Sequence, residues 1–453
     1  MEKKEEILEL KDNILSLLEQ RRFHEVRQTL GDLYEADVAQ LLEELESAPA
    51  CQAFRLLPKD MAAEVFSYLE PESQQKLISL LTDAELEKIL EDMYVDDTVD
   101  MIEELPANVV KRVLKLSSPE SRGEINRLCR YEEDTAGSIM TTEMVDLKRG
   151  MTVGQAFDHI RKVGTDAETI YTCYVTDEYR KLEGVVSVRQ LLLHPYETKV
   201  GDLMEQDPIC AQTGDDQETI AQLFQKYDML ALPVVDSERR LVGIITIDDA
   251  VDVIQEENTE DIEKMAAILP GDKPYLKTPV FEIFKHRIPW LLLLMISATF
   301  TGNIITSFED KLAASLVLTA YIPMLMDTGG NSGSQTSVTI IRGLSLDDIH
   351  FRDLFKVIWK ELRIAALCSI TLAACNFVKL LLLDRLTIPV AATICCTLVV
   401  TVISAKLIGC ILPMVAKKIG FDPAVMASPL ITTIVDAVSL LVYFGFATLI
   451  LHV

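Results

Sequence analysis

The feature that most constrains this chain is a run of 21 residues, Ile288 to Phe308, without a single ionisable side chain. A helix of that length covers about 30 Å, which is the thickness of the hydrocarbon core of a bilayer. Four further long apolar stretches follow, at Leu312–Ile341, Ile364–Leu383, Leu386–Ala416 and Pro429–Leu451. The sequence therefore predicts a membrane domain of five helices, in contact with lipid.

The short loops between these stretches predict the orientation in the membrane, because Lys and Arg are retained on the cytoplasmic side. Positive residues precede the first stretch and lie between the second and third and between the fourth and fifth, whereas the other loops have no positive excess. We therefore expect a bacterial plasma-membrane protein with a cytoplasmic N-terminus and a C-terminus outside. The positive side chains are Lys285, His286, Arg287, Arg342, Arg352, Lys356, Lys360, Arg363, Lys417 and Lys418.

Ionisable residues inside the apolar stretches need a physical reason, since a charge in the middle of a bilayer costs roughly 3 kcal/mol. Lys379 and Lys406 lie near the ends of their stretches, and we expect both to extend to the interface. Asp436 is too short to do so. Thr432 and Thr433 share one helical face with Asp436, and their oxygens form a stripe suited to Mg2+ or Ca2+. The alternative is a protonated Asp436 bonded to a neighbouring helix.

The second stretch contains the polar segment from Asp327 to Thr336, which includes three glycines and the amide of Asn331. Irregular backbone at membrane depth requires protein or water around it. We therefore expect a broken helix here, whose carbonyl and amide oxygens hold a hydrated cation. The alternative is close packing of small residues.

The two parts of the chain differ sharply in charge. Residues 1–270 hold 28 Lys and Arg against 58 Asp and Glu, whereas residues 271–453 hold 15 against 12. Such an acidic region repels nucleic acid and anionic lipid and attracts cations. The nine cysteines include no CxxC pair or Cys/His cluster, so no zinc site is expected. Acidic solubility alone is the simpler explanation of the charge.

Short amphipathic helices with acidic starts recur through the first 130 residues and predict a wound stack of helices. We expect Asp37 and Asp83 to cap their helices. The pair Asp96 and Asp97, with Asp100 one turn later, is more acidic than a cap requires.

From about residue 131 the pattern changes to short apolar strands that alternate with helices, and it occurs twice. Met140 and Met204 are 64 residues apart, and Gly184 and Gly243 are 59 apart. This duplicated unit resembles a pair of CBS domains, which often bind adenine nucleotides such as ATP. The resemblance implies a nucleotide site at Gly243, Thr246 and Asp249 of the second copy. In the first copy Gln190 replaces the aspartate, so a second site is not implied.

The order of these parts resembles the MgtE magnesium channels over nearly the whole chain. The resemblance implies a mainly α membrane protein made of an acidic superhelical domain (1–130), tandem α/β CBS domains (131–257), a connecting plug helix (258–283) and a five-helix transmembrane domain (284–453). It further implies a homodimer that conducts Mg2+ inward through a pore between the subunits. Asp436 would hold the hydrated ion, with Asn331, Thr432 and Thr433 as its neighbours.

The family resemblance also implies that cytoplasmic Mg2+ closes the channel by binding at acidic interfaces. The matching sensor positions are Asp60, Asp96, Asp97, Asp100, Asp248, Glu256, Glu257, Glu260 and Asp261. The last four lie at i, i+1, i+4 and i+5 and form one carboxylate stripe on a helix. Like charges on such a stripe repel, so it should approach another acidic surface only with divalent ions between them. A solvated acidic face is the alternative.

Three other functions are weighed against a channel. A divalent-cation carrier coupled to H+ or Na+ would also need Asp436. A membrane-anchored enzyme is not expected, because no Walker loop, HExxH segment or nucleophile and base pair is present. A sensor without transport does not account for the polar stripe of the last stretch.

Overall fold

The computed structural model describes all residues except 1, 272–274, 277, 309–315, 427 and 452–453. The chain divides into two compact units, Met1–Ile254 and Gln255–Val453. Each unit is described by itself below.

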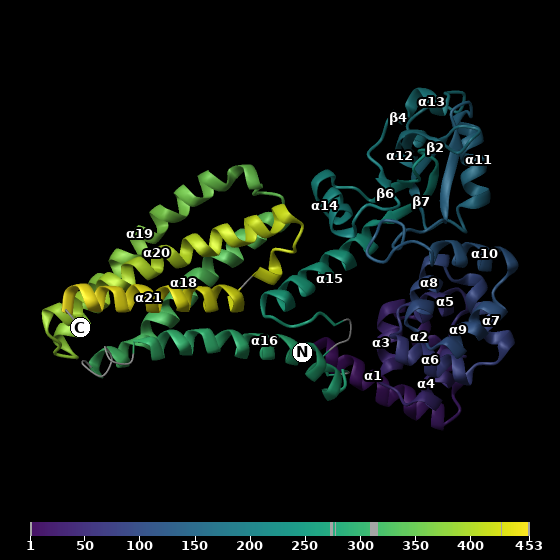
Figure 1. The fold of residues 1–453 in the computed structure, drawn as a ribbon. Helices are drawn as coiled ribbons and strands as arrows, with labels where there is room; N and C mark the ends of the chain where they lie inside the picture. Colours follow the sequence, from purple (N-terminus) through teal and green to yellow (C-terminus); the bar gives the residue numbers. More distant parts are fainter. Residues whose placement is uncertain (1, 272–274, 277, 309–315, 427, 452–453) are drawn as a thin grey trace. The chain divides into compact units, whose positions relative to one another are not determined.

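The first unit begins with a stack of short helices (Figure 1). Their buried aliphatic residues, from Ile7 to Val113, form one continuous core. The described helices are α1 (Glu2–Glu19), α2 (Phe23–Gly31), α3 (Glu35–Glu43), α4 (Ser47–Phe54), α5 (Lys59–Ser67), α6 (Pro71–Leu80), α7 (Asp83–Asp92), α8 (Val95–Glu104), α9 (Ala107–Leu116) and α10 (Pro119–Leu128). The expected helical stack is therefore present.

The capping roles expected for Asp37 and Asp83 are wrong. Asp37 lies in the first turn of α3, and the cap position of that helix is Tyr34. The cap of α7 is Thr82, whose hydroxyl accepts from the backbone N–H of Glu85 at 3.3 Å, while the Glu85 carboxylate accepts from the Thr82 N–H at 2.8 Å. An aspartate at a helix start is thus no proof of a cap.

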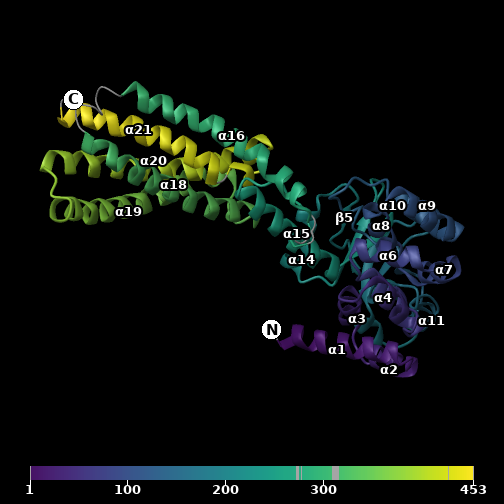
Figure 2. The same ribbon diagram turned by 90° about the horizontal axis from the view of Figure 1, so that it is seen from below.

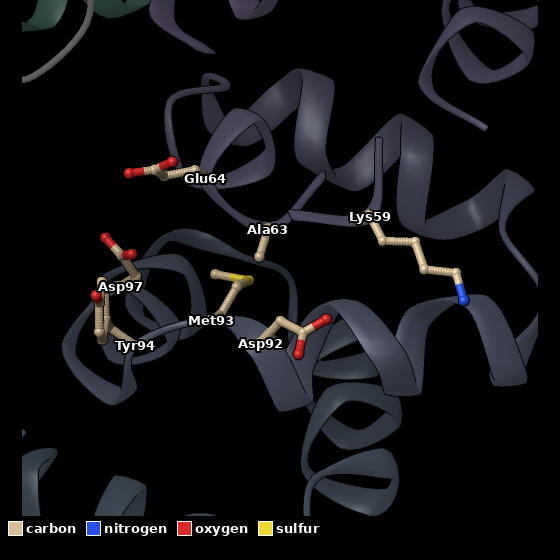
Figure 3. Close-up of a pocket in the computed structure, with 7 residues that line it drawn as sticks. All are labelled: Lys59, Ala63, Glu64, Asp92, Met93, Tyr94 and Asp97. Atoms are coloured by element: carbon tan, nitrogen blue, oxygen red, sulfur yellow. The ribbon is translucent and has the colours of Figure 1, made fainter. Parts of the chain in front are cut away.

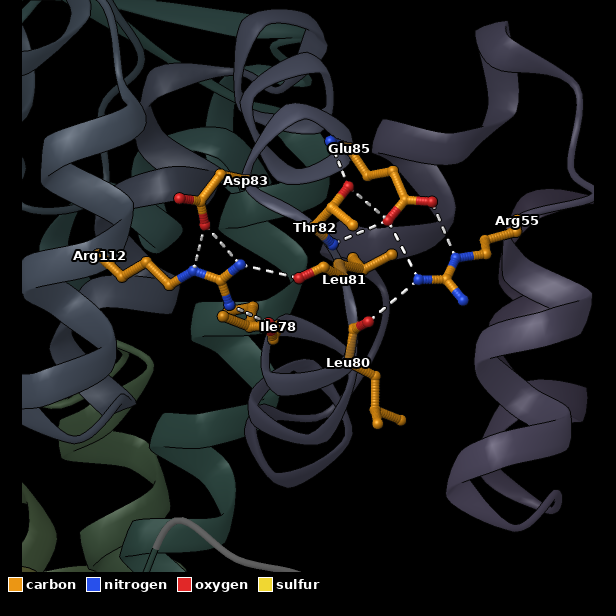
Figure 4. A network of polar contacts seen from close by, with 8 residues as sticks. All are labelled: Arg55, Ile78, Leu80, Leu81, Thr82, Asp83, Glu85 and Arg112. Carbon is orange, nitrogen blue, oxygen red and sulfur yellow. Dashed lines mark hydrogen bonds and ion pairs between the residues drawn. The ribbon is translucent and has the colours of Figure 1, made fainter.

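Two arginines join neighbouring helices around this cap (Figure 4). Arg112 of α9 donates to Asp83 at 2.7 Å, to the Leu81 carbonyl at 2.8 Å and to the Ile78 carbonyl. Arg55 donates to Glu85 at 2.8 Å. The Arg55 bond is the main reason that the pKa of Glu85 is lowered to about 2. The ends of helices α6 and α7 are therefore tied to their neighbours by charge-assisted bonds.

Two α/β repeats follow the helices. In the first, β1 pairs parallel with β2, β2 antiparallel with β3, and β3 antiparallel with β4; in the second, β5 pairs parallel with β6 and β6 antiparallel with β7. The elements are β1 (Met144–Lys148), α11 (Val153–Val163), β2 (Thr169–Thr176), β3 (Leu182–Ser187), α12 (Val188–Leu192), α13 (Val200–Leu203), β4 (Glu205–Gln206), β5 (Ala211–Gln212), α14 (Gln217–Tyr227), β6 (Ala231–Val235) and β7 (Leu241–Thr246). The order of elements confirms the duplicated unit.

Helices α8 and α10 pack on the second repeat. Val95 and Val99 of α8 share a buried core with Phe224, Ile245 and Ala250 of the second repeat. Apolar burial of this kind holds two domains together at roughly 25 cal/mol per Å2. The acidic turn of α8 is therefore fixed beside the end of β7.

The connecting helix differs from the expected range 258–283. Helix α15 (Ile247–Met265) begins directly after β7, at the strand-to-helix turn of the second repeat, and ends eighteen residues earlier than expected. The next helix among the described residues begins at Val280. The reason is local, because Pro270, Gly271, Pro274 and Pro279 lie between them and oppose helix formation.

Long helices make up the rest of the second unit and run side by side (Figures 1 and 2). Four described segments, Val280–Ser307, Phe351–Leu382, Ile388–Ile419 and Ala424–Leu451, are long and apolar enough to cross a membrane. Helix α18 carries the polar segment and is not one of them. The long helices are α16 (Val280–Ser307), α18 (Leu316–Ser345), α19 (Leu354–Leu382), α20 (Ile388–Ile419) and α21 (Ser428–Leu451). A membrane domain of several passes is therefore present.

The helix break expected at Asp327–Thr336 is wrong, because α18 continues through these residues. Their glycines serve packing instead. A Cβ atom on Gly329 would lie 2.7 Å from Thr401 of α20 and 2.8 Å from Val435 of α21. The small residues thus let three helices approach closely, as in many membrane interfaces.

Candidate ion pathway and cation sensor

The polar stripe of α21 has the arrangement that a cation ligand needs. The hydroxyls of Thr432 and Thr433 donate to the Pro429 carbonyl, at 2.9 and 3.1 Å. Their protons are therefore engaged, and their oxygens present lone pairs. Asp436 is half-buried on the following turn. Carboxylate and hydroxyl oxygens are the hard ligands that Mg2+ prefers.

The stripe of α21 meets α18 beside Asn331. A Cβ atom on Gly330 would lie 2.9 Å from the Thr432 methyl group, so the two helices are in contact there. Asn331 itself is exposed, as are Asp327 and Gln335, one turn away on each side. These three positions, i, i+4 and i+8, form a polar face of α18, which we call the α18 stripe.

Lys379 and Lys406 differ in their surroundings. Lys379 is half-exposed and forms an ion pair with Asp384 at 3.3 Å beyond its helix end, as an interfacial lysine does. Lys406 does not reach the interface as we expected, because it is only 5 % exposed. Its ammonium donates to Thr336 at 3.2 Å.

The first unit gathers carboxylates between α8 and the second repeat. Asp96, Asp97 and Asp249 are half-buried, whereas Asp100 and Asp248 are exposed. Burial and repulsion from Asp97 raise the pKa of Asp96 to about 6, and one oxygen of Asp96 has no hydrogen-bond partner. Burial, with repulsion from Asp249, raises the pKa of Asp97 to about 6 as well. Ionised carboxylates therefore oppose this contact unless a cation accompanies them.

Two further carboxylates of the first repeat belong to the cluster and were missed from the sequence. Burial and repulsion from Asp96 raise the pKa of Glu143 to about 7 and that of Glu168 to about 8. Glu143 accepts from the backbone N–H of Val95 at 3.1 Å. The same charges help burial raise the pKa of Tyr94 to about 12. Each glutamate directly precedes a strand, and the local sequence does not single it out as a ligand. We call the seven carboxylates of Asp96, Asp97, Asp100, Glu143, Glu168, Asp248 and Asp249 the acidic cluster.

A cavity of about 370 Å3 opens next to the cluster. Asp97, Tyr94 and Glu64 lie at one end of it, and Asp92 and Lys59 lie toward the other (Figure 3). Helices α5, α7 and α8 supply these side chains. The cavity gives water access to the edge of the cluster.

The acidic cluster suits a cation that keeps part of its water shell. Among the residues that the structure describes, no three His, Cys, Asp or Glu side chains converge closely enough to hold one metal directly. Mg2+ commonly binds through one or two carboxylates and several waters, which fits this spacing. The side chain of Asp60, another predicted sensor residue, lies outside the described residues.

The remaining predicted sensor residues lie on the second half of α15, in the second unit. Glu260 accepts from Lys264 at 2.6 Å, and Lys264 also pairs with Asp422 at 2.8 Å. Asn258 on the same half of the helix accepts from Arg342 at 3.0 Å. The stripe of Glu256, Glu257, Glu260 and Asp261 is therefore partly compensated by a lysine of its own helix.

The predicted nucleotide residues lie at the strand-to-helix turn between β7 and α15. Thr246 is buried and donates its hydroxyl to Asp249 at 2.7 Å. A Cβ atom on Gly243 would lie 2.6 Å from the Thr141 carbonyl, so only glycine fits there. Because Asp249 also faces the carboxylates of α8, it belongs to two predicted sites at once.

A membrane domain of several passes, a polar stripe with a carboxylate inside it, and an acidic region with two α/β repeats are together features of a multi-pass cation transport protein. Family models agree in each part: the MgtE intracellular N domain matches residues 33–134, the CBS domain matches 136–197 and 200–256, and the divalent cation transporter MgtE matches 322–446.

Relatives extend this likeness over almost the full chain. The magnesium transporter MgtE of Thermus thermophilus is 37% identical over 432 residues, covering 94% of this chain and 95% of the relative. That of Bacillus subtilis is 32% identical, covering 97% of each. The chain therefore belongs to the MgtE family of magnesium transporters.

Solved structures of relatives resemble the soluble region. The cytosolic domain of the Mg2+ channel MgtE in complex with ATP is 38% identical, with a TM-score of 0.51, and covers 54% of this chain and 99% of that one. The soluble part of a magnesium transporter is 33% identical, with a TM-score of 0.52; the match covers 55% of this chain and 99% of the solved chain. The expected architecture of helical and CBS domains is thereby confirmed.

Proposed function

We propose that this protein is a Mg2+-selective channel for magnesium influx across the bacterial plasma membrane, closed from the cytoplasmic side by Mg2+ bound at its acidic interfaces. The observation that carries the proposal is Asp436, a carboxylate deep in a long apolar helix, on one face with two threonine oxygens whose protons are already donated. Such a group in a membrane helix faces water or an ion rather than lipid.

The pore is proposed to lie between two copies of the chain. The α18 stripe of Asp327, Asn331 and Gln335 is exposed on the single chain, although each of these side chains is polar. Lipid is a poor solvent for an amide or a carboxylate, so a second copy and the water between the two copies would cover this face. Asn331, Thr432, Thr433 and Asp436 would then line one path for the hydrated ion.

Closure is proposed to follow from the acidic cluster. Asp96, Asp97 and Glu168 of the cluster have raised pKa values because burial and repulsion from neighbouring carboxylates disfavour their charges. Divalent ions with part of their water shell would lower that repulsion and favour the contact between α8 and the second repeat. A few kcal/mol of preference for one state suffices to shift a two-state gate.

The second half of α15 would supply the link to the membrane helices. Glu256, Glu257, Glu260 and Asp261 lie on it, and Asp60 is proposed as a further ligand on α5. Neutralising all four together should abolish the inhibition of uptake by internal Mg2+, and unchanged inhibition would exclude this stripe as a sensor.

An adenine nucleotide is proposed at Gly243, Thr246 and Asp249, since a relative's cytosolic domain was solved with ATP. Asp249 is shared with the acidic cluster and its carboxylate already accepts from Thr246. Nucleotide binding would therefore change the charge seen by α8, and ATP and Mg2+ should alter one another's affinity.

The decisive experiment is magnesium uptake in a cell that requires added Mg2+ for growth, with wild type and Asp436→Ala. Wild type should restore growth and the variant should not, while both are present in the membrane. Rescue by both would remove Asp436 from the pathway. Currents far above the turnover of a carrier, without dependence on a proton or sodium gradient, would separate the channel from a coupled carrier.

A further inference from the structure

Three polar side chains meet in the interior of the membrane unit, one each from α18, α19 and α20. Thr336 is 3% exposed, Lys406 5% and Glu361 8%. Lys406 Nζ donates to Thr336 Oγ1 at 3.2 Å, and Thr336 Oγ1 donates to Glu361 Oε2 at 3.1 Å. One hydroxyl therefore joins an ammonium to a carboxylate, by accepting from the first and donating to the second.

The network is internally compensated. A single charge buried in a membrane helix is costly, whereas an opposite charge joined to it through hydrogen bonds offsets part of that cost. Lys406 has the same sign as the transported ion, so it does not ligate that ion. These side chains therefore hold helices together instead of contacting the ion.

The backbones of α18 and α20 touch beside this network. Gly409 lies one turn after Lys406, and a Cβ atom on it would be 2.4 Å from the Gly333 carbonyl and 3.3 Å from Thr336 Cβ. Gly333 is also close to α21, since a Cβ atom on it would lie 2.8 Å from Ile431. At this depth α18 is held on two sides without room to shift.

The rotation of α18 about its axis decides where its stripe points. Gly329, Gly333 and Thr336 lie at i, i+4 and i+7 on the packed face, whereas Asn331 lies on the opposite side and is exposed. A contact that fixes Thr336 thus also fixes the direction of Asn331.

We propose that Lys406, Thr336 and Glu361 form a buried charge clamp that sets the rotation of α18 and thereby positions the α18 stripe for ion passage. The three are positioning residues, and the inference rests on the proposed function of that stripe. Nothing in the clamp requires a bound ion, because its own two charges compensate each other.

The test uses the full-length protein and reads Mg2+ uptake in Lys406→Met, Glu361→Gln and the double variant. Each single variant leaves one buried charge alone, and uptake should fall at least about tenfold. The double variant removes both charges and should recover most of the lost uptake. Lys379→Met is the matched control, since its half-exposed ammonium lies at a helix end, and it should behave as wild type.

Thr336 gives a second pair of variants that keeps the packing nearly constant. Thr336→Ser retains the hydroxyl that joins Lys406 to Glu361 and should transport Mg2+ normally. Thr336→Val keeps the volume but loses the hydroxyl, so its uptake should be reduced as much as that of the single charge variants. This pair decides the outcome if a charge variant fails to insert in the membrane.

Rotation is read directly by modifying Asn331→Cys with a membrane-impermeant thiol reagent and measuring the product at that position by mass spectrometry. The rate of thiol modification at position 331 should change about tenfold in Lys406→Met and return to the wild-type rate in the double variant. Normal uptake and labelling in the single charge variants and Thr336→Val, with Asp436→Ala inactive, would overturn the clamp alone. Normal uptake in Asp436→Ala would instead overturn the proposed pathway.

Discussion

Neutralising Asp97 should stabilise the contact between α8 and the second repeat. Its pKa is about 6, against an ordinary value of 3.8, because the carboxyl is buried beside Asp249. A difference of about 2 pKa units corresponds to about 3 kcal/mol. At a pH where Asp97 is ionised, its charge opposes the contact by about that amount, and Asp97→Asn removes the opposition.

The pH dependence has a definite sign. The Asp97 carboxyl has a higher pKa in the folded protein than in the unfolded chain. Its contribution to the free energy of folding is therefore favourable at low pH and is lost as the pH rises through about 6. Wild-type protein without divalent ions should therefore be better protected at α8 near pH 5 than near pH 8. Asp97→Asn should lose only the share of this change that Asp97 contributes, because Asp96, Glu143 and Glu168 still titrate over the same pH range. Added Mg2+ should help wild type more than the variant.

Hydrogen exchange measured by mass spectrometry on the full-length protein in lipid nanodiscs tests this prediction. With a chelator near pH 8, amides of α8 should exchange about 100-fold more slowly in Asp97→Asn than in wild type, the ratio that about 3 kcal/mol gives. Glu87→Gln, an exposed change on α7, should leave them unaffected. Equal or faster exchange in Asp97→Asn would refute the account of the cluster as uncompensated charge.

Three further changes have expected outcomes. Gly409→Ala should lower uptake and reduce the free energy of unfolding by about 1–3 kcal/mol, because its Cβ would lie 2.4 Å from the Gly333 carbonyl. Thermal unfolding in detergent checks this. Gly445→Ala is the control and should be neutral, because the space around Gly445 is open. Lys264→Met leaves Glu260 and Asp422 without their shared ammonium, so hydrogen exchange at the end of α15 should become faster with a chelator and recover with Mg2+. Lys356→Met, which removes an exposed ion pair, is its control. Arg112→Met should lower the unfolding free energy of the first unit by about 2 kcal/mol, measured by urea titrations followed by circular dichroism. Lys111→Met is the control and should leave the midpoint unchanged. An unchanged midpoint in Arg112→Met would show that the bonds of Arg112 to Asp83 and Leu81 are dispensable.

The sequence was sufficient for the features that depend on pattern. Apolar length predicted the four described helices that are long and apolar enough to cross a membrane, and the repeated spacing of Gly184 and Gly243 predicted the two α/β repeats. Asp96 and Asp97 were found because they are adjacent and exceed what a helix cap needs. In each case the physical cause is local, so neighbours in the chain carry the signal.

Features that depend on distant partners were missed. Glu143 and Glu168 join the acidic cluster only because the first repeat folds beside α8. Lys406 was placed at the interface from its position in the apolar stretch, since its partners Thr336 and Glu361 are 70 and 45 residues away. The glycines near Asn331 were interpreted first as a helix break and, as the alternative, as close packing of small residues; their contacts with α20 and α21 agree with the alternative, and the local sequence could not decide between the two.

The same kind of group has two different roles in this molecule, and its nearest positive charge decides which. Glu361 is joined to Lys406 through the hydroxyl of Thr336, so its carboxylate is compensated and serves as a scaffold whether or not an ion is present. The acidic cluster has no described ion pair to a Lys or Arg, so its charges depend on an external cation and its stability must follow the cation concentration. Glu260 lies between these limits because Lys264 compensates it together with Asp422. A lysine introduced beside Asp97 should therefore make the contact between α8 and the second repeat independent of Mg2+, as we propose for Glu361 within the membrane unit.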